Sequence, residues 1–210
     1  MMRILIVDDH AVVREGVKRI LDDTEDAILV GEASNGQELL VKATPKAWDV
    51  VLLDISMPGR NGLDVLRQLK NLQPTLPVLV FSVHPERQYA VRAFKAGAAG
   101  YLTKDSIPEE LVAAVRKVVA GRRYVSAALA EYLALEVARD PETPPHTRLS
   151  DRELQVLCML GSGKTVTSIA AELSLSVKTI STYRRRILEK MHLRTNAELI
   201  RYAVHHELMD

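Results

Sequence analysis

Five side chains in the first half of the sequence could act together on one ligand, because each follows a short apolar run: Asp8, Asp9, Asp54, Ser82 and Lys104. In a sheet of parallel strands, ligands bind beyond the carboxyl ends of the strands. Three carboxylates repel one another unless a cation joins them, and their hard oxygens favour Mg²⁺, which accepts a phosphoryl oxygen. A hydroxyl and a lysine beside them could orient and neutralise such oxygens. These residue types predict a magnesium-assisted phosphoryl site.

The elements that must position these side chains are apolar runs rich in Val, Ile and Leu. They are nearly unbroken, as is typical of parallel strands buried on both faces, and they span residues 4–7, 28–30, 50–53, 78–81 and 100–102. Segments with helical spacing of apolar residues lie between them, at 12–21, 36–43, 63–69, 87–96 and 108–119. Capping-box spacing in the pairs Ser34/Gln37 and Ser106/Glu109 predicts two of the helix starts. Five such units predict an α/β fold with a five-stranded, doubly wound parallel sheet.

The rest of the sequence has a helical pattern. Residues 124–138 predict one more helix, and residues 139–148, with three prolines among five residues, predict a linker. Capping signals then mark further helix starts at Ser150, Ser176 and Thr195, with a short helix over 168–173 and a longer one over 177–191. We therefore expect three parts: a sheet domain over 1–122, a linker over 123–146 and a small all-α, four-helix domain over 147–210.

Charge is distributed unevenly between the two halves. Residues 1–146 hold 18 Lys and Arg against 20 Asp and Glu, a balance of −2, whereas residues 147–210 hold 10 against 7, a balance of +3. The excess is concentrated in one stretch, opposed only by Glu189: Lys178, Arg184, Arg185, Arg186, Lys190 and Arg194. A focused basic patch on a small domain indicates a polyanionic partner.

Composition excludes several classes of protein. No apolar run approaches the roughly 20 residues needed to cross a bilayer, so no membrane association is expected. The first nine residues already contain two carboxylates, which is unlike a signal peptide. The single cysteine, Cys158, cannot form a disulfide framework and suits a reducing compartment. We expect a cytoplasmic protein.

The motifs DDH, LLDISMPGRNGL, FS and YLTKD together resemble the receiver domain of two-component response regulators. The resemblance implies a flavodoxin-like receiver in which Asp54 is the phosphoacceptor. It also implies that Asp9 and Asp54 ligate Mg²⁺ directly, that the backbone carbonyl of Ser56 is a third ligand, and that Asp8 acts largely through water.

The same resemblance assigns the remaining receiver residues. Lys104 would pair with the phosphoryl group, Ser82 would move to bond it, and Tyr101 would rotate inward as an aromatic switch. Pro58 and Gly62 would belong to the loop after the acceptor. One departure concerns Asp105, which stands where many receivers have a proline in a cis peptide; the geometry of that loop is left open.

Residues 148–207 resemble the LuxR-type helix-turn-helix, and the pairing with a receiver is that of the NarL/FixJ class. In the segment 177–191, Ile180 and Ile187 recur at helical spacing and would pack inward. The outward face could enter the major groove, with base contacts from Ser181, Thr182 and Arg185. The resemblance offers the others as phosphate or structural contacts: Lys178, Thr179, Tyr183, Arg184, Arg186, Lys190 and Arg194.

The function implied is a two-component response regulator, not an enzyme. A sensor histidine kinase would phosphorylate Asp54, and phosphorylation would promote a homodimer that binds double-stranded promoter DNA and regulates transcription. A magnesium-dependent aspartyl-phosphate enzyme is the first alternative, but such enzymes place a second carboxylate two residues after the nucleophile, where Ser56 stands here. The second alternative is a receiver whose C-terminal helices bind only proteins, which the basic helix disfavours.

Overall fold

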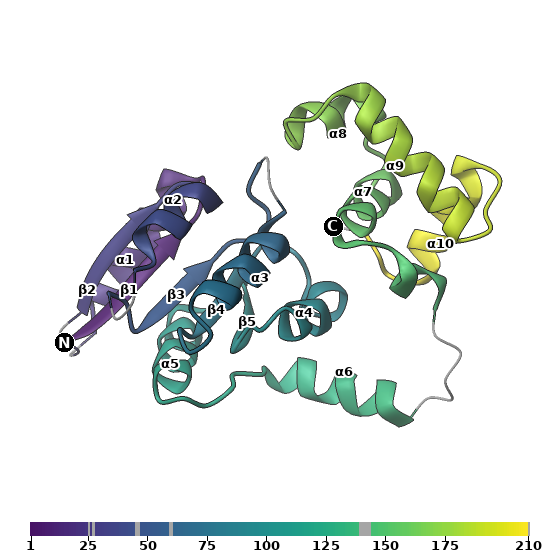
Figure 1. Cartoon of the computed structure of the whole chain (residues 1–210). Coiled ribbons are helices and arrows are strands. Elements are labelled where there is room, and N and C mark those ends of the chain that lie inside the picture. Colours follow the sequence, from purple (N-terminus) through teal and green to yellow (C-terminus); the bar gives the residue numbers. More distant parts are fainter. Residues whose placement is uncertain (25, 27, 45–46, 59–60, 139–143, 210) are drawn as a thin grey trace. The chain divides into compact units, whose positions relative to one another are not determined.

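The computed structural model describes residues 1–24, 26, 28–44, 47–58, 61–138 and 144–209 (Figure 1). They form two compact units, one over Met1–Glu136 and one over Val137–Asp210. Half of the proline-rich stretch 139–148 expected to be a linker, namely residues 139–143, lies outside the described residues. No helix in the described part of the chain is both long enough and apolar enough to cross a membrane.

The first unit alternates strands and helices. Its order is β1 (Met2–Val7), α1 (Ala11–Asp22), β2 (Ile28–Ala33), α2 (Gly36–Lys42), β3 (Val50–Leu53), α3 (Gly62–Leu72), β4 (Val78–Ser82), α4 (Glu86–Lys95), β5 (Gly100–Thr103) and α5 (Pro108–Val119). Helix α6 (Ala127–Ala138) follows, and all but its last two residues belong to this unit. All strand pairs are parallel, in the order β2-β1-β3-β4-β5. The prediction of a five-stranded, doubly wound parallel sheet is confirmed.

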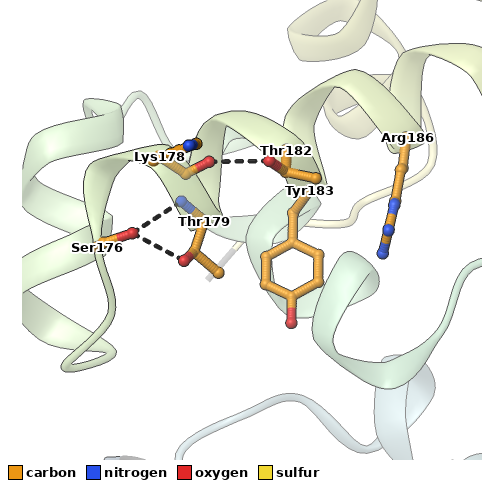
Figure 2. Close-up of a pocket in the computed structure, with 6 residues that line it drawn as sticks. All are labelled: Ser176, Lys178, Thr179, Thr182, Tyr183 and Arg186. Atoms are coloured by element: carbon orange, nitrogen blue, oxygen red, sulfur yellow. Dashed lines mark hydrogen bonds between the residues drawn. The ribbon is translucent and has the colours of Figure 1, made fainter.

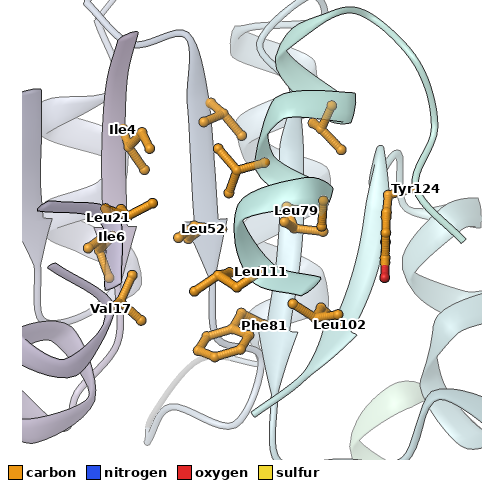
Figure 3. Close-up of a cluster of buried hydrophobic side chains, with 14 residues drawn as sticks. Ile4, Ile6, Val17, Leu21, Leu52, Leu79, Phe81, Leu102, Leu111 and Tyr124 are labelled. Carbon is orange, nitrogen blue, oxygen red and sulfur yellow. The ribbon is translucent and has the colours of Figure 1, made fainter. Parts of the chain in front are cut away.

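One face of the sheet packs against α1 and α5 (Figure 3). Strand residues such as Ile4, Leu52 and Leu79 meet Val17 of α1 and Leu111 of α5 in this cluster. The alternate strand residues point to the opposite face and are also buried, among them Leu5, Leu53 and Val80. Because both faces are covered, only the strand ends can present polar side chains to a ligand.

The second unit is entirely helical in its described part. After the short 3-10 helix η1 (Pro145–Arg148) come α7 (Asp151–Gly161), α8 (Val166–Glu172), α9 (Val177–Lys190) and α10 (Asn196–His205). Helix α7 packs on α9 and α10, and α8 packs on α9. Ile180 and Ile187 are both fully buried, as the helical spacing predicted. The outward face of α9 is consequently fixed by the packing of its inner face.

The structure confirms the predicted helix start at Ser150 and changes three others. The capping box of Ser150 and Glu153 is present in full. The one predicted at Ser34 is wrong, because Asn35 caps α2 and accepts from Glu38 N. The one at Ser106 is also wrong, since Ile107 precedes α5 without a side-chain cap and Pro108 opens the helix. Helix α8 begins at Val166, earlier than the predicted 168, because Thr165 caps it.

Candidate functional site

The ends of β1, β3 and β5 bring three charged side chains together. Asp8 and Asp54 are each 2% exposed. Lys104 Nζ lies 2.6 Å from Asp8 Oδ2 and 2.6 Å from Asp54 Oδ2. Burial alone would lower the pKa of Lys104, but the charges and hydrogen bonds of Asp54 and Asp8 raise it above its ordinary value. The lysine is therefore a fixed positive charge beside two buried carboxylates.

Backbone amides hold the other oxygen of each carboxylate. Asp54 Oδ1 accepts from Ser56 N at 2.8 Å, and Asp8 Oδ1 accepts from His10 N at 2.8 Å. Both bonds span two residues and close a tight turn immediately after a strand. The orientation of each carboxylate is thus set by the loop that follows it, so the loop after Asp54 is part of the site.

The donor set at this corner suits a hard divalent cation. Asp8, Asp9 and His10 place one potential ligand atom each within 4.8 Å of one another. Asp9 Oδ1 is buried and accepts no hydrogen bond from the described residues, while His10 Nδ1 lies 3.2 Å away. A buried carboxylate oxygen in that position is costly unless a cation compensates it, and carboxylate oxygens are what Mg²⁺ prefers. Asp54 is not part of this group, but Lys104 joins it to Asp8.

The residues expected to act as a switch are both buried. Ser82 Oγ lies 3.0 Å from Ser56 Oγ and accepts from His84 N at 3.3 Å. The Tyr101 hydroxyl donates to the backbone carbonyl of His84 at 2.9 Å, so the ring already points inward. Sequence reasoning missed His84, whose ring stacks on Tyr89 with centroids 4.5 Å apart. A single histidine after a strand carries no spacing signal that could have revealed this role.

The loops beside the site also show why particular residues occur there. A Cβ on Gly62 would lie 2.3 Å from Ile55 Cα, so α3 can begin this close to the Asp54 loop only with glycine. Pro58 precedes two residues that the structure does not describe. After Lys104 the chain continues through a turn containing Asp105, and the described residues contain no cis peptide bond. The peptide bond between Lys104 and Asp105 is therefore trans.

Helix α9 forms a second candidate site (Figure 2). Ser176 caps it by accepting from Thr179 N at 3.0 Å, and Thr182 Oγ1 donates to Lys178 O at 2.9 Å. A shallow hollow of about 350 Å³ opens beside the helix and is lined by Ser176, Lys178, Thr179, Thr182, Tyr183 and Arg186. Its lining offers two cations, three hydroxyl-bearing short side chains and one aromatic ring, a combination suited to phosphate and sugar contacts.

Some of the predicted DNA-contacting residues are exposed, whereas others are paired with side chains of the same unit. Ser181, Arg185 and Arg186 are exposed on the outer face of α9, and Arg194 is exposed beyond its end. Arg185 Nε is 3.7 Å from Glu189, and Arg184 Nε donates to Asn196. Lys190 Nζ donates to Glu153 at 2.7 Å, so it is engaged within the unit. The outer face of α9 therefore presents short side chains and Arg185 to solvent, where the major groove of DNA could approach it.

Comparison with known proteins identifies a domain family for each unit. Residues 4–116 match the model of the response regulator receiver domain, and residues 147–203 match that of bacterial regulatory proteins of the luxR family. The chain is 39% identical to the response regulator UvrY of Escherichia coli strain K12 over 209 residues, covering 99% of this chain and 96% of UvrY. It is 42% identical to the response regulator GacA of Pseudomonas aeruginosa over 211 residues, covering 100% and 99%.

Among solved structures, RcsB from Salmonella enterica serovar Typhimurium is similar over both units. That protein was solved bound to the promoter rprA in the presence of the phosphomimetic beryllofluoride. It matches with a TM-score of 0.65 and 26% identity, covering 96% of this chain and 98% of RcsB.

Proposed function

The chain belongs to the response regulators that join a receiver domain to a LuxR-type DNA-binding domain, and from that premise we propose that phosphorylation of Asp54 controls its binding to promoter DNA. The observation that carries the proposal is the buried Asp54 carboxylate, held 2.6 Å from Lys104 at the end of β3. A carboxylate in that position is oriented for attack, and a cation beside it can stabilise the charge of an acyl phosphate.

The phosphoryl donor would be a phosphohistidine of a sensor kinase. An Asp54 oxygen attacks phosphorus, a phosphorus–oxygen bond forms, and the phosphorus–nitrogen bond breaks with its electron pair left on the histidine. Lys104 is positioned to pair with the transferred group, and Ser56 N holds the carboxylate during attack. Asp8, Asp9, Asp54 and the Ser56 carbonyl would hold Mg²⁺. When bound, the ion would neutralise phosphoryl oxygens as a Lewis acid.

An exposed apolar rim around this corner supports docking of the kinase. Val12 is 85% exposed, Val83 is 59% exposed and Ile107 is 62% exposed. They follow β1, β4 and β5 respectively, so they lie in segments that begin at the strand ends carrying Asp8, Ser82 and Lys104. Exposed apolar side chains grouped around a polar site mark a protein interaction surface.

The response to phosphorylation would begin at Ser82. A phosphoryl group on Asp54 adds charge and acceptor oxygens, which would draw the Ser82 hydroxyl away from Ser56. His84 N donates to that hydroxyl, and the His84 carbonyl accepts from Tyr101. Because Tyr101 is already buried, the switch in this chain would act on its hydrogen bond to His84 instead of on a rotation of the ring.

The output would be binding of a homodimer to double-stranded DNA through α9. Ser181, Thr182 and Arg185 would read base edges in the major groove, and the basic residues around them would contact phosphates. Ile200 and Val204 are exposed one turn apart on α10 and would form part of a dimer contact. We also infer that the chain turns over no external substrate, since Ser56 stands where an acid/base carboxylate would be needed. Its action on promoter DNA would place it in the cytoplasm.

Intact-mass spectrometry after incubation with Mg²⁺ and acetyl phosphate tests the proposal. We expect one labile phosphoryl adduct on the parent chain and none on Asp54→Ala. The adduct should be accompanied by a shift toward dimer on a sizing column and by tighter binding to a duplex selected from random DNA. Absence of the adduct on the parent chain would contradict phosphorylation of Asp54. An adduct that left the DNA affinity unchanged would contradict a regulatory role for phosphorylation.

A further inference from the structure

The chain leaves the receiver sheet along its β5 edge. Tyr124 N donates to Ala99 O at 2.9 Å, and Tyr124 forms an isolated parallel bridge with Gly100, the first residue of β5. The Tyr124 hydroxyl donates to Glu110 in the first turn of α5 at 2.6 Å. These contacts fix the path of the chain between α5 and α6. As a result, α6 begins on the side of the receiver formed by α4 and β5.

Two adjacent residues of α4 then hold the first half of α6. The Ser126 hydroxyl donates to the Glu86 carboxylate, and the same Ser126 oxygen accepts from Leu129 N at 3.1 Å, as an N-cap does. The Arg87 guanidinium lies 5.8 Å from the centroid of the Tyr132 ring, within cation–π range. Leu129, on the turn between these contacts, is 1% exposed. We call Glu86, Arg87, Ser126 and Tyr132 the α4–α6 clasp.

The same end of α4 is attached to the candidate phosphorylation site. His84, two residues before Glu86, donates its backbone N–H to Ser82 and accepts the Tyr101 hydroxyl at its carbonyl. Its ring stacks on Tyr89 inside α4. The first turn of α4 is therefore bonded on one side to the residues that would respond to Asp54 and on the other side to the linker helix.

The electrostatics of the clasp favour easy opening. Burial raises the pKa of Glu86, the Ser126 hydrogen bond lowers it, and the nearby charge of Glu110 raises it again, for a net upward shift. The ionised carboxylate of Glu86 is thus held in surroundings that disfavour its charge. A displacement of α4 that exposed Glu86 to water would relieve this cost.

We propose that the α4–α6 clasp is the element through which the state of Asp54 reaches the linker. With Asp54 unmodified, Glu86 and Arg87 hold α6 on the receiver. When Ser82 is drawn toward the phosphoryl group, His84 and the first turn of α4 move with it, and α6 is released. The inference rests on the proposed function of Asp54 and adds to it a named route to the DNA-binding unit.

Hydrogen exchange of the full chain, read by mass spectrometry on peptides that cover α6, tests this inference. The probe is beryllofluoride with Mg²⁺, and its binding is followed separately by fluorine NMR. Glu86→Ala removes the clasp carboxylate but leaves Ser126 to cap α6. Glu109→Ala is the matched control, because Glu109 is an exposed carboxylate in the first turn of the neighbouring helix α5. Tyr132→Leu tests the second contact, and Tyr132→Phe retains the ring that makes this contact.

We expect Glu86→Ala to accelerate exchange of the α6 amides by about tenfold without beryllofluoride, as loss of a hydrogen bond to a charged group would. Glu109→Ala should leave that exchange unchanged. Beryllofluoride should accelerate α6 exchange in the parent and add little in Glu86→Ala. Parent-like exchange in both Glu86→Ala and Tyr132→Leu would overturn the clasp. Bound beryllofluoride with unchanged α6 exchange in the parent would overturn the route, whereas no bound beryllofluoride would instead overturn the proposed function of Asp54.

Discussion

The ammonium group of Lys190 lies 2.7 Å from the carboxylate of Glu153 and joins the end of α9 to the start of α7. Glu153 has a side chain that is only 3% exposed, and it also accepts from Ser150 N at 2.8 Å in the capping box of α7. One buried carboxylate therefore caps one helix and anchors another. This pair makes Lys190 a positioning residue for α9 and argues against the direct phosphate contact considered from sequence.

Replacing Lys190 by Met tests that role. Each phosphate contact contributes about 0.9 to the slope of log affinity against log salt concentration. We expect Lys190→Met to weaken binding to a selected duplex while leaving the slope unchanged, and Lys190→Arg to restore affinity. Arg186→Met is the control, because loss of a phosphate contact should lower the slope by about 0.9. A similar fall in the slope for Lys190→Met would place Lys190 on the DNA instead. Affinities would be measured by fluorescence anisotropy over a range of salt concentrations.

The Glu153 carboxylate should also make stability depend on pH. Burial acts to raise its pKa, but hydrogen bonds from Lys190 and Ser150 outweigh burial and lower it below the ordinary 4.5. A carboxyl with a lowered folded-state pKa contributes stability above its unfolded pKa and loses it as pH falls through the folded value. Glu153→Gln should therefore cost about 1–2 kcal/mol at neutral pH, with the difference shrinking below pH 4.5. Thermal unfolding by circular dichroism would measure it, and a pH-independent difference would contradict this cause.

Replacing Lys104 should make the stability of the protein depend more strongly on a bound cation near Asp8 and Asp54. Lys104→Met leaves the buried carboxylates of Asp8 and Asp54 without their shared partner. Loss of one member of a buried ion pair costs about 3 kcal/mol or more. We expect a lower midpoint of thermal unfolding in EDTA and a larger gain on adding Mg²⁺ than the parent shows. Lys95→Met, at an exposed position of α4, should show neither effect. No gain on adding Mg²⁺ to either protein would count against a cation site here, and equal gains would show that Lys104 does not compete with the ion.

Gly62 should tolerate no side chain. A Cβ there would meet the backbone of Ile55 at 2.3 Å, and neither backbone can yield without moving the Asp54 loop. Gly62→Ala should cost about 2 kcal/mol in urea unfolding and reduce labelling by acetyl phosphate, because Ser56 N orients Asp54. Gly16→Ala is the matched control: its Cβ would meet nothing within 4 Å on the exposed face of α1, so it should be neutral or stabilising. Unimpaired labelling in Gly62→Ala would show that the loop adapts.

Local patterns in the sequence determined which segments form strands and helices. Unbroken apolar runs identified the parallel strands, and serine three residues before glutamate identified the start of α7. Where two capping residues stand side by side, as Ser34 and Asn35 do, spacing alone could not choose between them. Polar residues after the strands pointed to one corner because parallel strands end on the same side of a sheet.

Only the tertiary structure decided how those residues meet. The fold brings Lys104, which follows the edge strand β5, within 2.6 Å of both Asp8 and Asp54, although 50 residues separate Lys104 from Asp54 along the chain. It likewise assigns Lys190 to a carboxylate 37 residues away and attaches α6 to α4 through Glu86 and Ser126. The periodicity of a segment depends on its own residues, whereas a partner across the fold depends on how every intervening element packs. Residue types and spacing were therefore enough to predict the chemistry of the site at Asp8, Asp9 and Asp54. The contacts of Ser82 and Tyr101, and those that hold α6 on α4, could be found only in the folded chain.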